Sequence, residues 1–142
     1  MFSKTNAMKN VVQSSHQVQQ VLKYTYGIVP IVAGLDKFTN LLTDWKAYLG
    51  GPVANLLPFS AASFMTIVGI IEIAAGLLVL ARPKIGAWVV MAWLILIALT
   101  LLLSGRYFDV AVRDLVMAIG AFALAKLSPA FADEKAPSPA VA

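Results

Sequence analysis

The chain has 142 residues, of which 60% are hydrophobic and only 13% are charged; it has no cysteine and a single histidine, His16. Its mean hydropathy of +0.81 lies far above that of a soluble domain, so the composition predicts an integral membrane protein. Disulfides are excluded, and one chain cannot form a Cys/His metal site or a bis-histidine haem site. The net charge of +4 is scattered over predicted helix ends, which favours orientation in a lipid bilayer over binding of nucleic acid.

The N-terminal part combines a polar segment with a first apolar segment. Residues 1–20 are too polar for a secretory signal, and we expect them to be retained as a weakly amphipathic segment lying at the membrane interface. A first membrane span is predicted at about residues 23–42. It contains Pro30, which a membrane helix tolerates with a kink, and it places Gly27, Gly34 and Lys37 near one face.

A second predicted span, residues 59–81, carries one charged residue, Glu72, near its middle. An ionisable group at such a position costs about 2.5–3.5 kcal/mol on insertion scales, so Glu72 must face the protein interior, find a cation or stay protonated. Gly69 and Gly76 share its face and allow a neighbouring helix to approach closely. Between the first two spans, residues 43–58 have the composition of an interfacial connection or of a lid.

The second half of the chain predicts two more spans, at residues 85–103 and about 110–127. Arg82-Pro83-Lys84 form the turn before the third span, and Arg113 and Asp114 lie in the first turns of the fourth. Residues 128–142 are rich in proline and alanine and are expected to be a disordered tail. The predicted fold is therefore all-α: a polytopic bundle of four transmembrane helices over residues 21–127.

The distribution of basic residues predicts the orientation of this bundle. Loops on alternate sides of the membrane place seven of the 11 Lys and Arg residues on one side and four on the other. The first group is Lys4, Lys9, Lys23, Arg82, Lys84, Lys126 and Lys135; the second is Lys37, Lys46, Arg106 and Arg113. By the positive-inside rule, both termini are expected in the cytoplasm of a bacterial-type inner membrane.

One charged constellation stands out as the candidate site. Asp36 and Lys37 of the first span and Arg113 and Asp114 of the fourth fall near the outer end of the bundle, with Glu72 deeper. We expect a buried polar cluster in which Glu72 pairs with Lys37 or Arg113. Three roles stay open: ion pairs that fix helix register, a proton-titrating or ligand-binding Glu72, or an intersubunit contact.

Aromatic residues offer a second, weaker candidate. Trp45, Tyr48 and Tyr107 could stack on a quinone ring at the outer interface, although aromatic residues are typical of that belt in any membrane protein. No sulfur-rich run indicates copper, and no nucleophile–base pair or nucleotide-binding motif is present. We therefore expect no covalently bound or metal-ligated cofactor, and quinone is the candidate ligand.

Three short motifs resemble the DoxX-like family of small membrane proteins. They are Gly34-Leu35-Asp36-Lys37-Phe38, Glu72-Ile73-Ala74-Ala75-Gly76-Leu77-Leu78 and Arg113-Asp114-Leu115. The resemblance covers roughly residues 21–127 and implies a four-helix membrane bundle associated with quinone-linked sulfur oxidation or membrane oxidoreductase assemblies. It also implies that Lys37, Glu72, Arg113 and Asp114 occupy the family's polar positions.

On this resemblance we expect an accessory subunit or scaffold of a quinone-linked redox complex, working as a homo-oligomer or as one subunit of the complex. Two alternatives remain open. One is a small quinone-binding or proton-handling membrane module that uses Glu72, and the other is an oligomeric transporter or channel. Four short helices enclose little volume, so a single chain is a poor pore.

Overall fold

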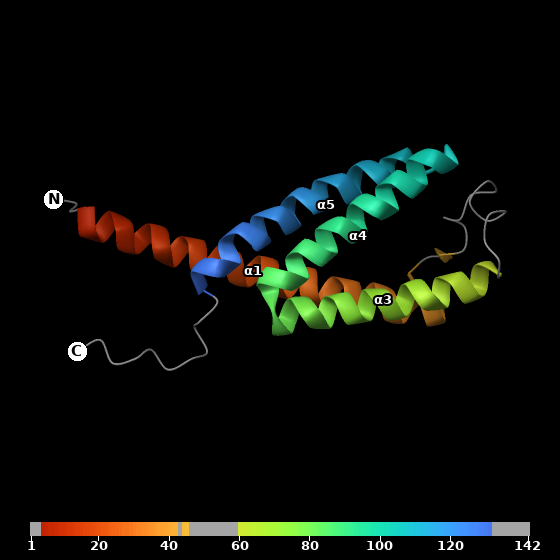
Figure 1. Ribbon diagram of the computed structural model, residues 1–142, viewed down its shortest axis with the longest axis horizontal. Helices are drawn as coiled ribbons and strands as arrows, with labels where there is room; N and C mark the ends of the chain where they lie inside the picture. Colours follow the sequence, from red (N-terminus) through yellow and green to blue (C-terminus); the bar gives the residue numbers. More distant parts are fainter. Residues whose placement is uncertain (1–3, 43, 46–59, 132–142) are drawn as a thin grey trace.

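The computed structural model describes residues 4–42, 44–45 and 60–131, and these residues form helices connected by short turns (Figure 1). Four long helices follow one another: α1 (Lys4–Thr39), α3 (Ala61–Ala81), α4 (Pro83–Ser104) and α5 (Phe108–Leu127). A short 3-10 helix, η2 (Ser128–Phe131), follows α5. No strand occurs in the described residues, so the all-α prediction with four long helices is confirmed.

Local sequence explains where the helices begin and end. Ser60 caps α3, because its hydroxyl accepts the backbone N–H of Ser63. Pro83 opens α4 at a position where its missing N–H has no cost, directly after Arg82. Gly105 ends α4 with a φ of 72°, a left-handed conformation that glycine adopts without strain. The predicted loop of residues 43–58 lies almost wholly outside the described residues.

Helix α1 is one continuous helix of 36 residues that passes through Pro30. The segment expected to lie at the interface, from Lys4 onward, instead continues the axis of the first predicted span and extends beyond the other helices (Figure 1). No glycine or proline interrupts the sequence before Gly27, so nothing forces the chain to turn. At the base of this extension, the buried Gln19 amide donates to the Ser128 hydroxyl at 3.3 Å.

The expected disordered tail begins with ordered residues. Ser128 is buried, and its hydroxyl donates to the backbone carbonyl of Leu124 at 2.6 Å while it accepts from Gln19. These two hydrogen bonds hold the start of η2 against α1 and α5. The remaining part of the predicted tail, residues 132–142, lies outside the described residues.

The helices form two close pairs, α1 with α3 and α4 with α5 (Figure 1). In the first pair, Gly27 lies against Gly76, and Gly34 lies against Gly69. A Cβ atom on Gly34 would stand 2.6 Å from the Gly69 carbonyl oxygen, so only glycine allows the helices to approach this closely. The two pairs diverge toward the end at which α3 begins and α4 ends (Figure 1).

Two apolar clusters explain this divergence. The first, the four-helix core, lies near the α3–α4 turn and contains Ala75, Val79, Ala87, Val90, Ala121, Leu124 and Ala125, with Leu22 and Tyr26 of α1 packed against it. The second, the α4–α5 core, contains only residues of that pair, Ala98, Leu101 and Ala111. The two helix pairs are therefore joined by apolar packing near the α3–α4 turn and separate beyond it.

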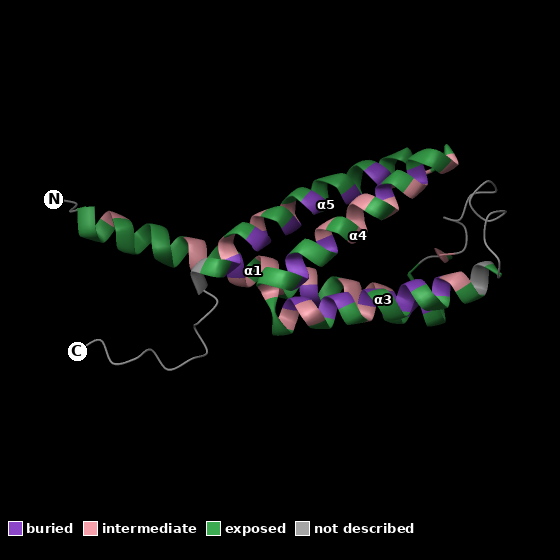
Figure 2. Ribbon diagram, viewed as in Figure 1, coloured by how far each residue is buried: buried purple, intermediate pink, exposed green. Residues whose placement is uncertain are grey.

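Large apolar side chains cover the outside of the molecule. Figure 2 shows exposed residues along the outer faces of all four long helices. They include Ile28, Val32 and Leu35 of α1, Ile67, Ile70 and Leu77 of α3, Val89, Leu96 and Leu99 of α4, and Val112, Val116 and Ile119 of α5. Among the described helices, two contain stretches long and apolar enough to cross a membrane, Ser63–Ala81 and Pro83–Ser104.

Candidate functional site

A buried ion pair joins α1 to α3. The Lys37 Nζ lies 2.6 Å from Glu72 Oε2, and the two side chains are only 4% and 10% exposed. Gly69 makes room for this pair, because a Cβ there would stand 3.3 Å from the Lys37 Cβ. The prediction that Glu72 pairs with one of two bases is confirmed, and Lys37 is the partner.

Asp114 of α5 adds a second carboxylate to this pair. It is 7% exposed and interacts electrostatically with both Glu72 and Lys37. Within the part of the chain that the structure describes, no hydrogen bond or ion pair involves its carboxylate. The Lys37–Glu72–Asp114 cluster thus contains one base and two acids, so its net charge is minus one when all three are ionised. Removal of charged groups from water costs free energy, and this cost is larger when a buried cluster has an unbalanced charge.

Helix α4 contributes Trp93 to the cluster. Its indole Nε1 lies 3.5 Å from Glu72 Oε1, the carboxylate oxygen that does not contact Lys37. At that distance the hydrogen bond is weak, and Glu72 Oε1 keeps most of its capacity to accept. Helix α1 therefore contacts Glu72 of α3 through Lys37, and α4 contacts it through Trp93, while Asp114 of α5 interacts electrostatically with the ion pair.

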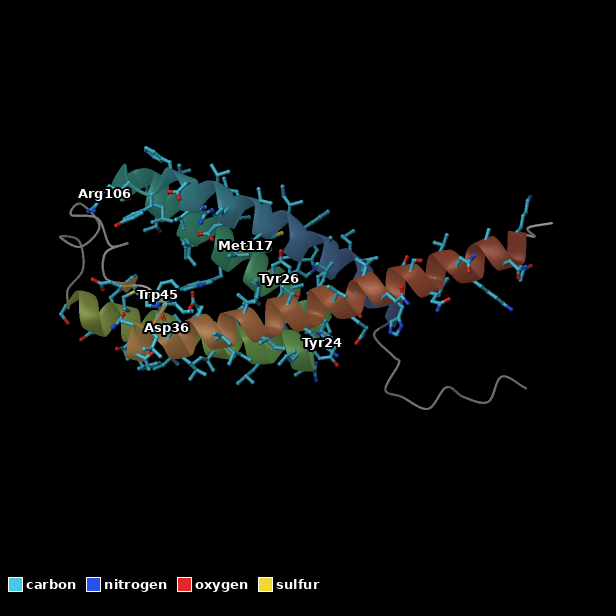
Figure 3. All side chains as sticks on the ribbon, turned by 180° about the vertical axis from the view of Figure 1, so that it is seen from behind. Tyr24, Tyr26, Asp36, Trp45, Arg106 and Met117 are labelled. Atoms are coloured by element: carbon cyan, nitrogen blue, oxygen red, sulfur yellow. The ribbon has the colours of Figure 1, made fainter. Side chains whose placement is uncertain are left out.

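Asp36 is buried beside the cluster, but its carboxylate binds other partners. Its carboxylate accepts the backbone N–H groups of Leu41 and Leu42, at 2.9 Å and 3.0 Å, and the indole N–H of Trp45 at 2.8 Å. Figure 3 shows Asp36 and Trp45 side by side at the end of α1. Asp36 therefore fixes the chain that leaves α1.

Trp45 connects this end of α1 to the cluster. The Lys37 ammonium lies 3.7 Å from the centre of the Trp45 ring, within the range of a cation–π interaction. One side chain thus holds Asp36 with its N–H and covers Lys37 with its ring. Of the other aromatic candidates for quinone, Tyr107 packs against the α4–α5 core, and Tyr48 lies outside the described residues.

Arg113, expected in the buried cluster, instead lies on the surface. Its guanidinium is 3.8 Å from Asp109, and the two side chains are 74% and 67% exposed. Neighbouring residues of a helix point about 100° apart, so α5 cannot turn both Arg113 and Asp114 inward. The buried face of α5 contains Asp114 and not Arg113. This face is a stripe of small residues at spacings of three and four, namely Ala111, Ala118, Ala121 and Ala125.

Sequence reasoning missed two polar contacts between the helix pairs. Trp93 lies in the third predicted span, and an indole N–H inside an apolar helix indicates a buried acceptor. The Tyr26 hydroxyl donates to the backbone carbonyl of Met117 at 2.7 Å and so connects α1 to α5 (Figure 3). Gly120 makes this contact possible, because a Cβ there would collide with the Tyr26 hydroxyl.

The described residues contain no group of three or more His, Cys, Asp or Glu side chains that could hold a metal ion. Comparison of the chain with protein-family models, curated proteins and solved structures gives no match. The DoxX-like resemblance therefore rests on its three short motifs.

Proposed function

We propose that the four long helices form a membrane bundle with four spans. Large apolar side chains cover the outer faces of all four helices, whereas Asp36, Lys37, Glu72 and Asp114 are buried between them. This distribution is the reverse of that in a water-soluble bundle, and it suits a lipid environment. Helix α1 is less apolar by composition because residues 4–20 are mostly polar and Asp36 and Lys37 are charged. Helix α5 is less apolar because it carries the exposed Asp109, Arg113 and Lys126 and the buried Asp114.

The proposed orientation in a bacterial-type inner membrane has both termini in the cytoplasm. The start of α1, the α3–α4 turn and the end of α5 lie toward the same end of the molecule (Figure 1), and most of the Lys and Arg residues belong to that end. The natural chain has no cysteine, so single cysteines report position cleanly. An impermeant thiol reagent should label Arg106→Cys in intact cells, whereas Ser3→Cys and Ser138→Cys should react only after lysis. The opposite pattern would reject this orientation.

Within this bundle, we propose that the cluster takes up and releases a proton. The observation that carries this function is Asp114, a buried carboxylate placed near a Lys37–Glu72 pair that is already neutral as a unit. A scaffold needs only the pair, since one base balances one acid. The additional acid is costly when ionised and neutral when protonated, which is the property of a proton-binding group.

The packing indicates from which end a proton would arrive. Ala75 and Val79 of α3, and Ala121 and Leu124 of α5, separate the cluster from the end with the α3–α4 turn, and all four are buried. Toward the other end the helix pairs diverge, and no apolar core of the described residues joins them. The proton would bind an oxygen of Asp114 from that outer end and leave the same way, while Lys37 and Glu72 remain paired.

A role in a quinone-linked redox complex is compatible with this proposal, because quinone reduction consumes protons. The Lys37 ammonium and the Trp93 indole are suitable donors to a quinone carbonyl oxygen, but both are directed at Glu72. The support for a quinone partner is therefore the family resemblance, and the support for proton binding is the cluster itself. The chain would act as a homo-oligomer or as one subunit of such a complex.

Infrared difference spectroscopy tests the proton function directly. The protein in lipid vesicles is measured at two pH values, and a protonated carboxyl group gives its own carbonyl band. The wild type should show such a band, and Asp114→Asn should lose it, while the exposed Asp109→Asn should keep it as a matched control. A wild-type spectrum without the band over the whole pH range in which the protein stays folded would leave only the scaffold role.

A further inference from the structure

Two lysines lie on the α4–α5 helix pair at the end with the α3–α4 turn. Lys84 is in the first turn of α4 and Lys126 is in the last turn of α5, and both residues are exposed (Figure 1). Neither side chain makes an ion pair or a hydrogen bond with a residue that the structure describes. Both ammonium groups are therefore available to a ligand.

A contact between two aromatic rings fixes how α4 and α5 align here. Trp88 of α4 and Phe122 of α5 meet edge to face, with ring centroids 5.9 Å apart. The two helices are antiparallel, so four residues back along α4 and four residues forward along α5 both lead one turn toward the α3–α4 turn (Figure 1). Lys84 and Lys126 therefore lie at the same level, one turn beyond the rings. The axes of packed helices are about 8–10 Å apart, and two flexible lysine side chains can converge on one ligand across that distance.

The charges at this level are not balanced within the described residues. Two ammonium groups that face the same space repel each other, and an anion between them turns this repulsion into attraction. The five acids that the structure describes lie beyond the four-helix core, toward the other end of the molecule; they are Asp36, Asp44, Glu72, Asp109 and Asp114. The pair of lysines thus favours an anionic ligand from outside the chain.

The surface next to the lysines is apolar. Trp88 and Phe122 are 41% and 46% exposed, and Ile119, about one turn further along α5 from Lys126, is 68% exposed. In the proposed bundle this face meets lipid, and its aromatic rings lie where headgroups give way to acyl chains. Two cations beside exposed aromatic and aliphatic side chains match a ligand that joins a negative headgroup to an apolar chain.

We propose that Lys84 and Lys126 bind the headgroup phosphate of one anionic phospholipid, with phosphatidylglycerol as the probe, and that Trp88 and Phe122 contact its acyl chain. This inference rests on the proposed membrane bundle and names a lipid partner for it. Phosphatidylcholine carries the same phosphate, but its choline group balances the charge, so the lysines gain less from it. Free phosphate ions would contact the lysines without covering the rings.

The experiment is native mass spectrometry of the purified full-length protein in a neutral detergent, titrated with phosphatidylglycerol or phosphatidylcholine of identical acyl chains. The wild type should bind phosphatidylglycerol more tightly. Lys84→Gln and Lys126→Gln should each weaken this binding about fivefold, and the double variant about 25-fold. Lys84→Arg and Lys126→Arg keep the charge and should keep the binding.

Lys23→Gln is the matched control and should bind phosphatidylglycerol like the wild type. Lys23 belongs to the other helix pair: it lies on α1 one turn before Gly27, where an added Cβ would meet Leu80 of α3. An equal loss of binding in Lys23→Gln would mean that only net charge matters, and it would overturn the site.

Two further results would also overturn the site: equal affinity of the wild type for the two lipids, and displacement of phosphatidylglycerol by sodium phosphate at equal ionic strength. The cysteine labelling described above tests the membrane bundle separately. If labelling gives the expected orientation and the two lipids bind equally, the bundle stands and only the lipid site fails.

Discussion

Gly34 of α1 and Gly69 of α3 lie backbone to backbone: a Cβ on Gly34 would stand 2.6 Å from the Gly69 carbonyl oxygen, and a Cβ on Gly69 would stand 2.8 Å from the Gly34 carbonyl oxygen. This contact lies one helical turn from Lys37 and Glu72. It sets the distance between the two helices at the place where the ion pair forms. The chemistry of the cluster thus depends on two residues without side chains.

Gly34→Ala should destabilise the protein by about 1–3 kcal/mol, because the added methyl group meets backbone atoms and forces α1 and α3 apart. The measurement is unfolding of the purified protein in a detergent denaturant series. Val32→Ala, at an exposed position of the same helix, is the control and should change little. Equal stability of Gly34→Ala and the wild type would mean that the close contact is not needed.

Lys37→Met should destabilise the protein by about 3–5 kcal/mol, because it leaves two buried acids without a base. Glu72→Gln should cost less, since the amide keeps the shape of the side chain and removes one of the two negative charges. The double variant should therefore be more stable than Lys37→Met alone. Arg113→Met is the control, because its ion pair is exposed. If the effects of the two changes are additive, the pair is not coupled.

Tyr26→Phe should cost about 0.5–1.5 kcal/mol, because it removes the hydrogen bond from the hydroxyl to the Met117 carbonyl and leaves the ring in place. Tyr24→Phe is a matched control, since Tyr24 is exposed on the same helix. Thermal unfolding of the two variants in the same detergent compares them directly. A larger loss for Tyr24→Phe would show that the connection between α1 and α5 is unimportant.

Asp36→Asn should release Trp45 from the end of α1. Both carboxylate oxygens accept N–H groups, so either orientation of the amide would point a donor at another donor. Fluorine NMR of fluorotryptophan-labelled protein resolves the three Trp residues, and only the Trp45 resonance should move strongly. The resonance should stay in place in Asp109→Asn. An unchanged Trp45 resonance in Asp36→Asn would show that other contacts hold the ring.

Several parts of the structure follow from the sequence because they depend on local chemistry. Uninterrupted apolar runs predict the long helices, and the Arg82-Pro83 turn and Gly105 limit them. The need of Glu72 for a partner also follows, because an unpaired buried acid is too costly to keep ionised. The position of Asp114 in a stripe of small residues was readable as well, since its spacing to Ala111 and Ala118 is that of one helix face.

The identity of the partners was decided only by the tertiary structure. Lys37 and Arg113 are equally suitable bases by charge, and the choice between them depends on how α5 is rotated and how closely α1 approaches α3. Trp93 reaches the Lys37–Glu72 pair because the four-helix core joins the two helix pairs at one end. These are contacts between residues distant in the chain, and local propensity contains no information about the distances between packed helices.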